Sequence, residues 1–259
     1  MISQNEKIKK LNNLFEQGKI DSVVSLLKDE SFKSGLNQHN AAFMFFMYKL
    51  YSAKEYVHSN ADKAREMLNK STQLKYSEAY SEKGRLLLFG LGCEVDVLGA
   101  EDSFRQSLSC EQSRYYIAEI YLKGMGTDSK KESFFDFVEA KDQLMAVVAM
   151  KGVFYKSALL KLAVIILNQE DLSSDDDDVI LVKVNELSCK DGIEGHNAKV
   201  ILGRYYVRKL KGVFSKMRGA QVVKPESYFD LMSLVDESKD SLSAIGRNVS
   251  DLWMLSDIT

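Results

Sequence analysis

The sequence predicts an all-α protein, an α-solenoid of about four to five helix-pair repeats with capping helices at both ends. Three observations predict this fold class. A spaced motif of small and large residues recurs along the chain, and a second apolar pattern recurs in step with it. The 259 residues also include a single proline, whereas proline usually makes up about 5 % of a protein. Self-similarity at a nearly constant period is typical of repeat arrays.

The first motif marks the first helix of each predicted pair. It consists of a small anchor, a large residue three positions later, and glycines six and eight positions later. Its two full copies are Gly84, Leu87, Gly90, Gly92 and Ala118, Tyr121, Gly124, Gly126. Small anchors let a neighbouring helix approach closely, and glycine ends a helix because it reaches left-handed backbone conformations without steric cost.

Another small residue stands five positions before each anchor, at Ala79 and Ser113. The same offset and the following large residue recur in two weaker copies. These are Ala158, Ala163, Ile166 and Ala198, Gly203, Tyr206. The four anchors at 84, 118, 163 and 203 are therefore separated by 34, 45 and 40 residues.

The second motif is an apolar face at spacing i, i+4, i+7, which predicts the second helix of each pair. Its copies are Ala64, Leu68, Ser71; Ala100, Phe104, Ser107; Ala140, Leu144, Val147; and Ile180, Val184, Leu187. Their starts are separated by 36, 40 and 40 residues, in step with the anchors. Twelve residues after each start stand Tyr76, Gln112, Gly152 and Gly192. We expect the last two of these to end their helices.

Together the two motifs resemble the Sel1-like repeat, a helix-pair relative of the tetratricopeptide repeat. The resemblance is clearest from Glu78 to Gly152 and weaker toward both ends. It implies a solenoid whose first helices line an extended binding surface, as is typical of repeat proteins. It also implies a role in scaffolding or regulation.

We predict one elongated domain, because no Gly-, Ser- or Pro-rich linker divides the chain. Residues 1–39 are expected to form N-terminal capping helices, over Lys7–Phe15 and Ser22–Leu27. The repeat array is expected over residues 40–241 and begins with an atypical repeat, Asn40–Tyr76, with Met47 and Leu50 at its anchor positions. Residues 242–259 are expected to form a C-terminal capping helix and tail, with the helix over Leu242–Leu255.

Three sequence signals predict individual helix starts. Ser129 and Glu132 have the spacing of a capping box ahead of the Phe134–Phe137 segment. Asp175–Asp178 precede another second helix, and Pro225 stands where a helix start would accept it.

The predicted compartment is the cytoplasm, without a membrane segment. The first seven residues contain no apolar stretch typical of a secretory signal. The apolar run Ala158–Leu167 includes Lys161 and is shorter than the roughly 20 residues that a bilayer span requires. The three cysteines are odd in number, which does not indicate a disulfide framework.

The sequence indicates no catalytic, cofactor or metal site. His39, His58 and His196 have no partner at a metal-ligand spacing. The segment Gly124–Lys130 contains glycines and a lysine, but it lacks the order of a phosphate-binding loop. We therefore predict a protein that is not an enzyme and that takes no cofactor.

Residues 204–224 carry seven cations and no acid, with three aromatic residues among them. Such a segment can cover a solvated helix end, dock an acidic protein, or bind a phosphate backbone. The formal net charge of −2 speaks against general nucleic-acid binding.

Asp175–Asp178 form the opposite feature, four consecutive acids. Acids at a helix start are stabilised by the positive end of the helix, so capping is the favoured interpretation. An acidic hook for a basic partner is the alternative. The spacing does not match a calcium loop.

These observations predict a non-enzymatic scaffold or adaptor that binds a partner protein in the solenoid groove. The residues one position after the anchors are predicted contacts that face outward: Arg85, Glu119 and Arg204. Tyr80, Arg114 and Lys199 share a second offset. One alternative is a cytoplasmic immunity protein that neutralises a toxin or enzyme through Asp175, Asp176, Asp177 and Asp178. The other is a nucleic-acid binder that uses residues 204–224.

Overall fold

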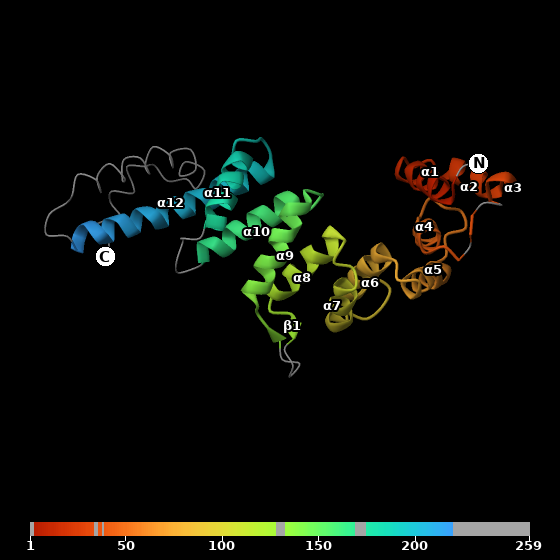
Figure 1. The fold of residues 1–259 in the computed structure, drawn as a ribbon, viewed down its shortest axis with the longest axis horizontal. Helices are drawn as coiled ribbons and strands as arrows, with labels where there is room; N and C mark the ends of the chain where they lie inside the picture. The colour runs from red at the N-terminus through yellow and green to blue at the C-terminus, as the bar shows by residue number, and fades with distance from the viewer. Residues whose placement is uncertain (1–2, 34–35, 38, 128–132, 169–174, 220–259) are drawn as a thin grey trace. The chain divides into compact units, whose positions relative to one another are not determined.

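A computed structural model describes residues 3–33, 36–37, 39–127, 133–168 and 175–219, with the backbone alone at 126–127, 133–134, 168, 175–178 and 208–219. The described residues up to Phe135 form one compact unit, and those from Asp136 onward form a second. Figure 1 traces both units along the chain. Each unit is considered separately below.

The first unit begins with three short helices, α1 (Gln4–Glu16), α2 (Ile20–Lys28) and α3 (Glu30–Lys33). A capping box starts α1, because Ser3 and Glu6 each accept a hydrogen bond from the backbone of the other. Apolar residues of all three helices, such as Leu11, Val23 and Phe32, share one core with Phe46 of the next helix. The predicted N-terminal helical pair is thus present and packs on the first repeat.

The first repeat consists of α4 (Ala41–Ser52) and α5 (Ala61–Gln73). Asn40 and Asn60 cap them, and their side chains accept hydrogen bonds from the backbone amides of Phe43 and Lys63 at 3.0 and 2.9 Å. Leu50 is fully buried, whereas Met47 is half-buried. The helices agree with the predicted repeat over residues 40–76.

The rest of the first unit contains α6 (Ser77–Phe89), α7 (Val97–Arg105) and α8 (Glu111–Leu122). The predicted anchors lie at helix contacts. Ala79, Ser113 and Ala118 have no exposed surface, and a Cβ atom on Gly84 would stand 2.6 Å from the Phe104 ring. Gly90 and Gly124 take left-handed conformations and stop α6 and α8 as expected.

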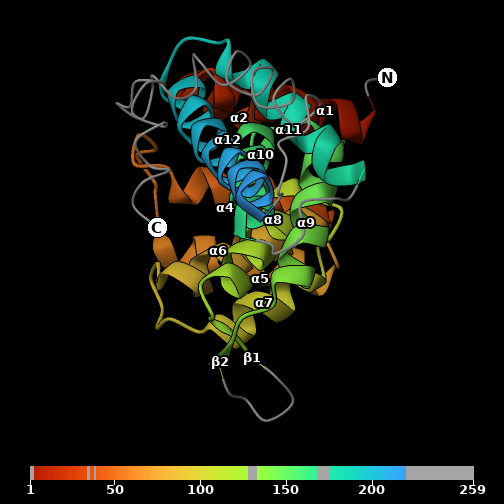
Figure 2. The ribbon, with the colours of Figure 1, turned by 90° about the vertical axis from the view of Figure 1, so that its left-hand side faces the viewer.

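A small hairpin separates α8 from the next helix, where the sequence indicated a helix start. Strand β1 (Gly126–Thr127) pairs antiparallel with β2 (Ser133–Phe134), so Gly126 belongs to a strand (Figure 2). The predicted capping residue Ser129 lies outside the described residues. The next helix starts only after Asp136, whose carboxylate accepts hydrogen bonds from the amides of Val138 and Glu139.

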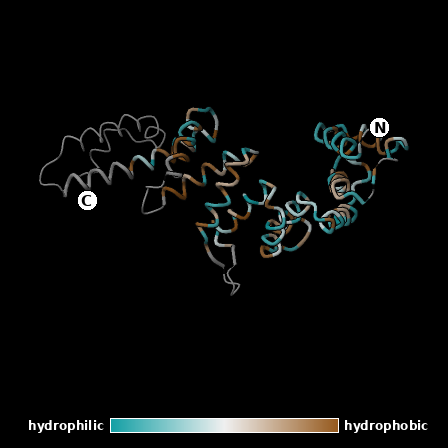
Figure 3. The backbone as a smooth tube through the Cα atoms, viewed as in Figure 1, coloured by the Kyte–Doolittle hydropathy of each residue, from teal (hydrophilic) through white to brown (hydrophobic). Residues whose placement is uncertain are grey.

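The second unit contains α9 (Phe137–Met150), α10 (Tyr155–Asn168), α11 (Asp175–Ser188) and α12 (Ile193–Gly219). Apolar residues are dense along α10 (Figure 3), where Ala158 and Ala163 are fully buried. The left-handed residue after α9 is Lys151, not Gly152. Gly192 has a positive φ of 106°, but α11 already ends at Ser188, and Gly192 lies directly before α12 instead of at the end of α11. Helix α12 extends for 27 residues and includes most of the basic segment over residues 204–224.

The predicted apolar face of the second helices is confirmed in all four copies. Each of its twelve positions is at most 5 % exposed: Ala64, Leu68, Ser71, Ala100, Phe104, Ser107, Ala140, Leu144, Val147, Ile180, Val184 and Leu187. Residues 220–241, Pro225 and the C-terminal helix over 242–255 lie outside the described residues. The predicted domain boundaries therefore stay predictions.

Candidate functional site

An open groove of about 800 Å³ lies over α4, α5 and α6 of the first unit. We call it the α4–α6 groove. Its charged lining residues are Lys54, Arg65, Lys83 and Arg85, and the described residues that line it include no acid. Tyr48, Tyr51 and Leu86 add aromatic and apolar surface. The groove therefore presents positive charge beside flat apolar side chains.

A hydrogen-bonded triad holds Arg85 at the groove. Its guanidinium donates to both carboxylate oxygens of Glu82, at 2.8 and 2.7 Å, and Glu82 also accepts from the hydroxyl of Tyr48 at 2.5 Å. The hydrogen bonds to Glu82 raise the pKa of Arg85, so it stays charged. Burial, together with the Glu82 carboxylate, raises the pKa of Tyr48. The phenol therefore stays neutral and donates a hydrogen bond to Glu82. The triad links α4 to α6 across two successive repeats.

This triad leads to a stability prediction. Replacing Tyr48 with phenylalanine removes one hydrogen bond to a carboxylate that is only 17 % exposed. We expect a loss of about 1.5–3 kcal/mol in the free energy of unfolding, measured by urea denaturation. Tyr80→Phe is the control, since the Tyr80 hydroxyl makes no hydrogen bond to the side chains that the structure describes. If the two variants lose equal stability, the hydrogen bond between Tyr48 and Glu82 does not contribute to the free energy of unfolding.

The predicted contact residues one position after the anchors differ in exposure. Arg85 is 33 % exposed and lines the groove, and Arg204 is exposed on α12 of the second unit. Glu119 is only 13 % exposed, and its Oε2 lies 2.9 Å from Nζ of Lys123. The expectation that Glu119 faces solvent is therefore wrong, because neighbouring side chains cover most of its carboxylate side chain.

The residues at the second shared offset, Tyr80, Arg114 and Lys199, are all half-buried. The Nε of Arg114 donates to the carbonyl of Leu108 at 2.7 Å, which ties it to the turn before α8. Asp175–Asp178 form the first turn of α11, a position where acids stabilise a helix. Whether any of these residues contacts a partner stays a prediction.

The basic segment lies on α12 as far as Gly219, while Lys224 lies outside the described residues. Six of its seven cations, up to Arg218, therefore belong to one continuous helix. Both its nucleic-acid role and the acidic-hook role of α11 remain sequence-based alternatives.

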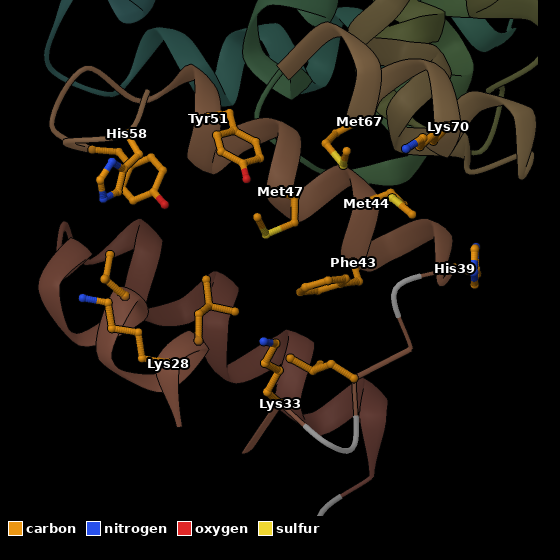
Figure 4. A pocket seen from close by; sticks show the side chains of 14 residues that line it. Lys28, Lys33, His39, Phe43, Met44, Met47, Tyr51, His58, Met67 and Lys70 are labelled. Atoms are coloured by element: carbon orange, nitrogen blue, oxygen red, sulfur yellow. The ribbon is translucent and has the colours of Figure 1, made fainter. Parts of the chain in front are cut away.

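A second cavity was not predicted from the sequence. It has a volume of about 530 Å³ and is lined by residues from α2, α3, α4, α5 and the segments between them (Figure 4). We call it the α2–α5 pocket. It includes His39 and His58, which we interpreted as isolated histidines. The only possible sequence signal was the clustering of Met44, Met47 and Met67, which apolar helix faces would have explained equally well.

The described side chains contain no group of three or more His, Cys, Asp or Glu residues arranged to hold a metal ion. Cys93, Cys110 and Cys189 are free thiols. Of the helices in the described ranges, none is both long and apolar enough to cross a membrane.

These features define a class of protein: a helix-pair repeat protein with buried small anchors. Helices of its first unit line the α4–α6 groove and the α2–α5 pocket. No family model and no curated protein matches the sequence. Several solved structures, including the following two, are similar to the chain.

A Sel1 repeat protein from Oxalobacter formigenes is 15 % identical, with a TM-score of 0.57, and the match covers 77 % of this chain and 76 % of that one. A protective antigen present in uropathogenic Escherichia coli strains, which displays an SLR fold, is 17 % identical, with a TM-score of 0.50. That match covers 66 % of this chain and 34 % of the antigen. The chain thus has the Sel1-like repeat fold, an all-α solenoid fold, as the motifs predicted.

Proposed function

We propose that this protein is a non-enzymatic scaffold or adaptor that binds a partner protein through the α4–α6 groove. The observation that carries the proposal is the groove itself, with four cations and no acid among its described lining residues. The Sel1-like repeat fold supports it, because stacked helix pairs present extended surfaces for protein partners. The proposal includes the cytoplasmic location predicted from the sequence.

The composition of the groove favours a protein over a nucleic acid. Tyrosine and arginine are the residues enriched at protein interfaces, and here Tyr48, Tyr51 and Arg85 occur together. Arg65 of the groove donates to the carbonyl of Gly92 at 3.2 Å and lies 4.0 Å from a carboxylate oxygen of Asp62, so its charge is already partly neutralised. Arg85 is likewise neutralised by Glu82. A backbone-phosphate site would instead need its cations free for the phosphates.

Partner capture tests this proposal. Affinity purification from the native cell, followed by mass spectrometry, identifies what the chain binds. Because a charge reversal at Arg85 would place two carboxylates side by side, the groove variant carries Arg85→Gln together with Lys83→Glu, both at positions that line the groove. We expect capture to fall at least about tenfold, as expected when central interface residues are lost.

The control variant is Lys9→Glu with Lys10→Glu, two exposed cations on α1 that do not line the groove. It should capture as much partner as the unchanged chain. Circular dichroism should show equal helicity in all three proteins. Undiminished capture by the groove variant would reject these residues as the contact surface.

A further inference from the structure

The α2–α5 pocket is built like a binding site for an apolar group. It lies between the core of the N-terminal helices and the core around Tyr48 and Leu68. Phe43, Met44, Met47 and Met67 point into it from α4 and α5 (Figure 4). Its volume of about 530 Å³ falls within the range of ligand pockets. Methionine side chains are flexible and polarizable, so they adapt to the shape of an apolar partner.

The rim of this pocket carries three lysines, Lys28, Lys33 and Lys70, and two histidines, His39 and His58. The described lining residues include no Asp or Glu, although Nζ of Lys70 lies 2.5 Å from Oε1 of Glu66 outside the lining. These groups are spread along the opening. Figure 4 shows His58 near one end, and His39 and Lys70 near the other. Lys28, Lys33 and both histidines are exposed, and the nearest acid to Lys33 is Glu30, at 3.8 Å.

We propose that the α2–α5 pocket binds an acidic amphipathic segment of a partner protein. Its apolar side chains enter between Phe43 and the methionines, and its carboxylates pair with the rim lysines. This inference rests on the proposed function, because it names the kind of segment that the partner presents. Amphipathic segments that lay an apolar face into a hydrophobic groove are a common mode of recognition.

The distribution of charge decides between this ligand and a single acyl anion. A fatty acid has one carboxylate and needs cations at one end of its pocket only. Here three lysines stand apart along the opening, Lys28 and Lys33 on the α2–α3 side and Lys70, which pairs with Glu66, on α5. A peptide segment with several acids around apolar anchors uses all of these groups. Complementary charges also accelerate association, so the rate of binding should fall as salt rises.

A displayed library of random 16-residue peptides, panned against the full chain, tests the inference. We expect the enriched peptides to combine Asp or Glu with Leu, Phe, Ile or Met at helical spacing. The most enriched one, labelled with fluorescein, is then titrated by fluorescence polarization. With Lys28→Glu and Lys33→Glu its affinity should fall at least about tenfold, since charge complementarity contributes to the binding.

Two controls accompany this titration. Lys9→Glu with Lys10→Glu changes the net charge equally but lies outside the pocket, and it should leave affinity within about twofold. Met47→Gln tests the apolar floor without changing charge, and it should also weaken binding. Urea melts of each variant show that the fold persists.

Several results would overturn the inference: no enrichment, enrichment of peptides without acids, or equal affinity in the pocket and control variants. Binding of dodecanoate without any peptide enrichment would make this an acyl-anion site instead. A native partner that is lost on groove mutation, yet kept by Lys28→Glu with Lys33→Glu, would leave the proposed function standing and reject this pocket as its docking site.

Discussion

Replacing Phe104 with alanine is expected to lower the free energy of unfolding by about 3–5 kcal/mol. Phe104 is fully buried on α7, where its ring packs against Gly84 of α6 and stacks on Tyr116 of α8 at 5.5 Å. One side chain thus joins three helices of successive repeats. The cavity left by its removal cannot close without moving these helices, so the cost includes both lost burial and an unfilled volume.

Urea denaturation followed by circular dichroism measures this loss. Phe89→Ala is the matched control, because the same atoms are removed from a ring that is 50 % exposed. It should cost clearly less, since less surface is withdrawn from water. A double-mutant cycle adds a second check. Gly84→Ala should destabilise the unchanged chain but cost less when Phe104 is alanine, because the ring that obstructs the new methyl group is gone.

If Phe89→Ala costs as much as Phe104→Ala, the contact between α6 and α7 does not carry the stability assigned to it. Additive effects in the cycle would show that Gly84 and Phe104 are not in close contact. Either result would mean that the described packing of the second helices against the first helices is incorrect.

Replacing Ala118 with leucine is expected to cost about 1–3 kcal/mol by overpacking. Ala118 is a predicted anchor of α8 and has no exposed surface. A larger side chain there must displace a neighbouring helix or adopt a strained rotamer. The measurement is again the free energy of unfolding in urea.

The control for this variant is Ala61→Leu, the same substitution at the exposed first residue of α5, which should change stability by no more than about 0.5 kcal/mol. The neighbouring position Glu119 cannot serve, because its side chain is mostly buried and paired with Lys123. Equal losses at Ala118 and Ala61 would mean that the repeat frame is misplaced.

The candidate site was predictable only in part. Arg85 was predicted to contact a partner, and it does line the α4–α6 groove. The hydrogen bond from Tyr48 to Glu82, which spans 34 residues, has no local pattern that reveals it. His39 and His58 seemed isolated because their neighbours in the α2–α5 pocket come from four different helices. Spacing within one helix cannot report such distant partners.

By itself, the sequence determined the repeat frame and the buried faces of the helices. Residues such as Leu68, Phe104 and Leu144 recur at helical spacing because one face of each helix leaves water, and that periodicity is written locally. Glycine pairs marked the ends of α6 and α8. Six residues after the anchor Gly203, where Gly90 follows the anchor Gly84, the chain has Lys209, and α12 continues past this position.

The tertiary structure decided which polar groups remain accessible to solvent and where the groove and the pocket form. Glu119 is covered although its repeat position matches the exposed Arg204, because exposure depends on the side chains of neighbouring helices. The groove and the pocket likewise arise where successive helices fail to fill the space between them. Such gaps depend on the volumes of side chains that are distant in sequence, and only packing brings them together.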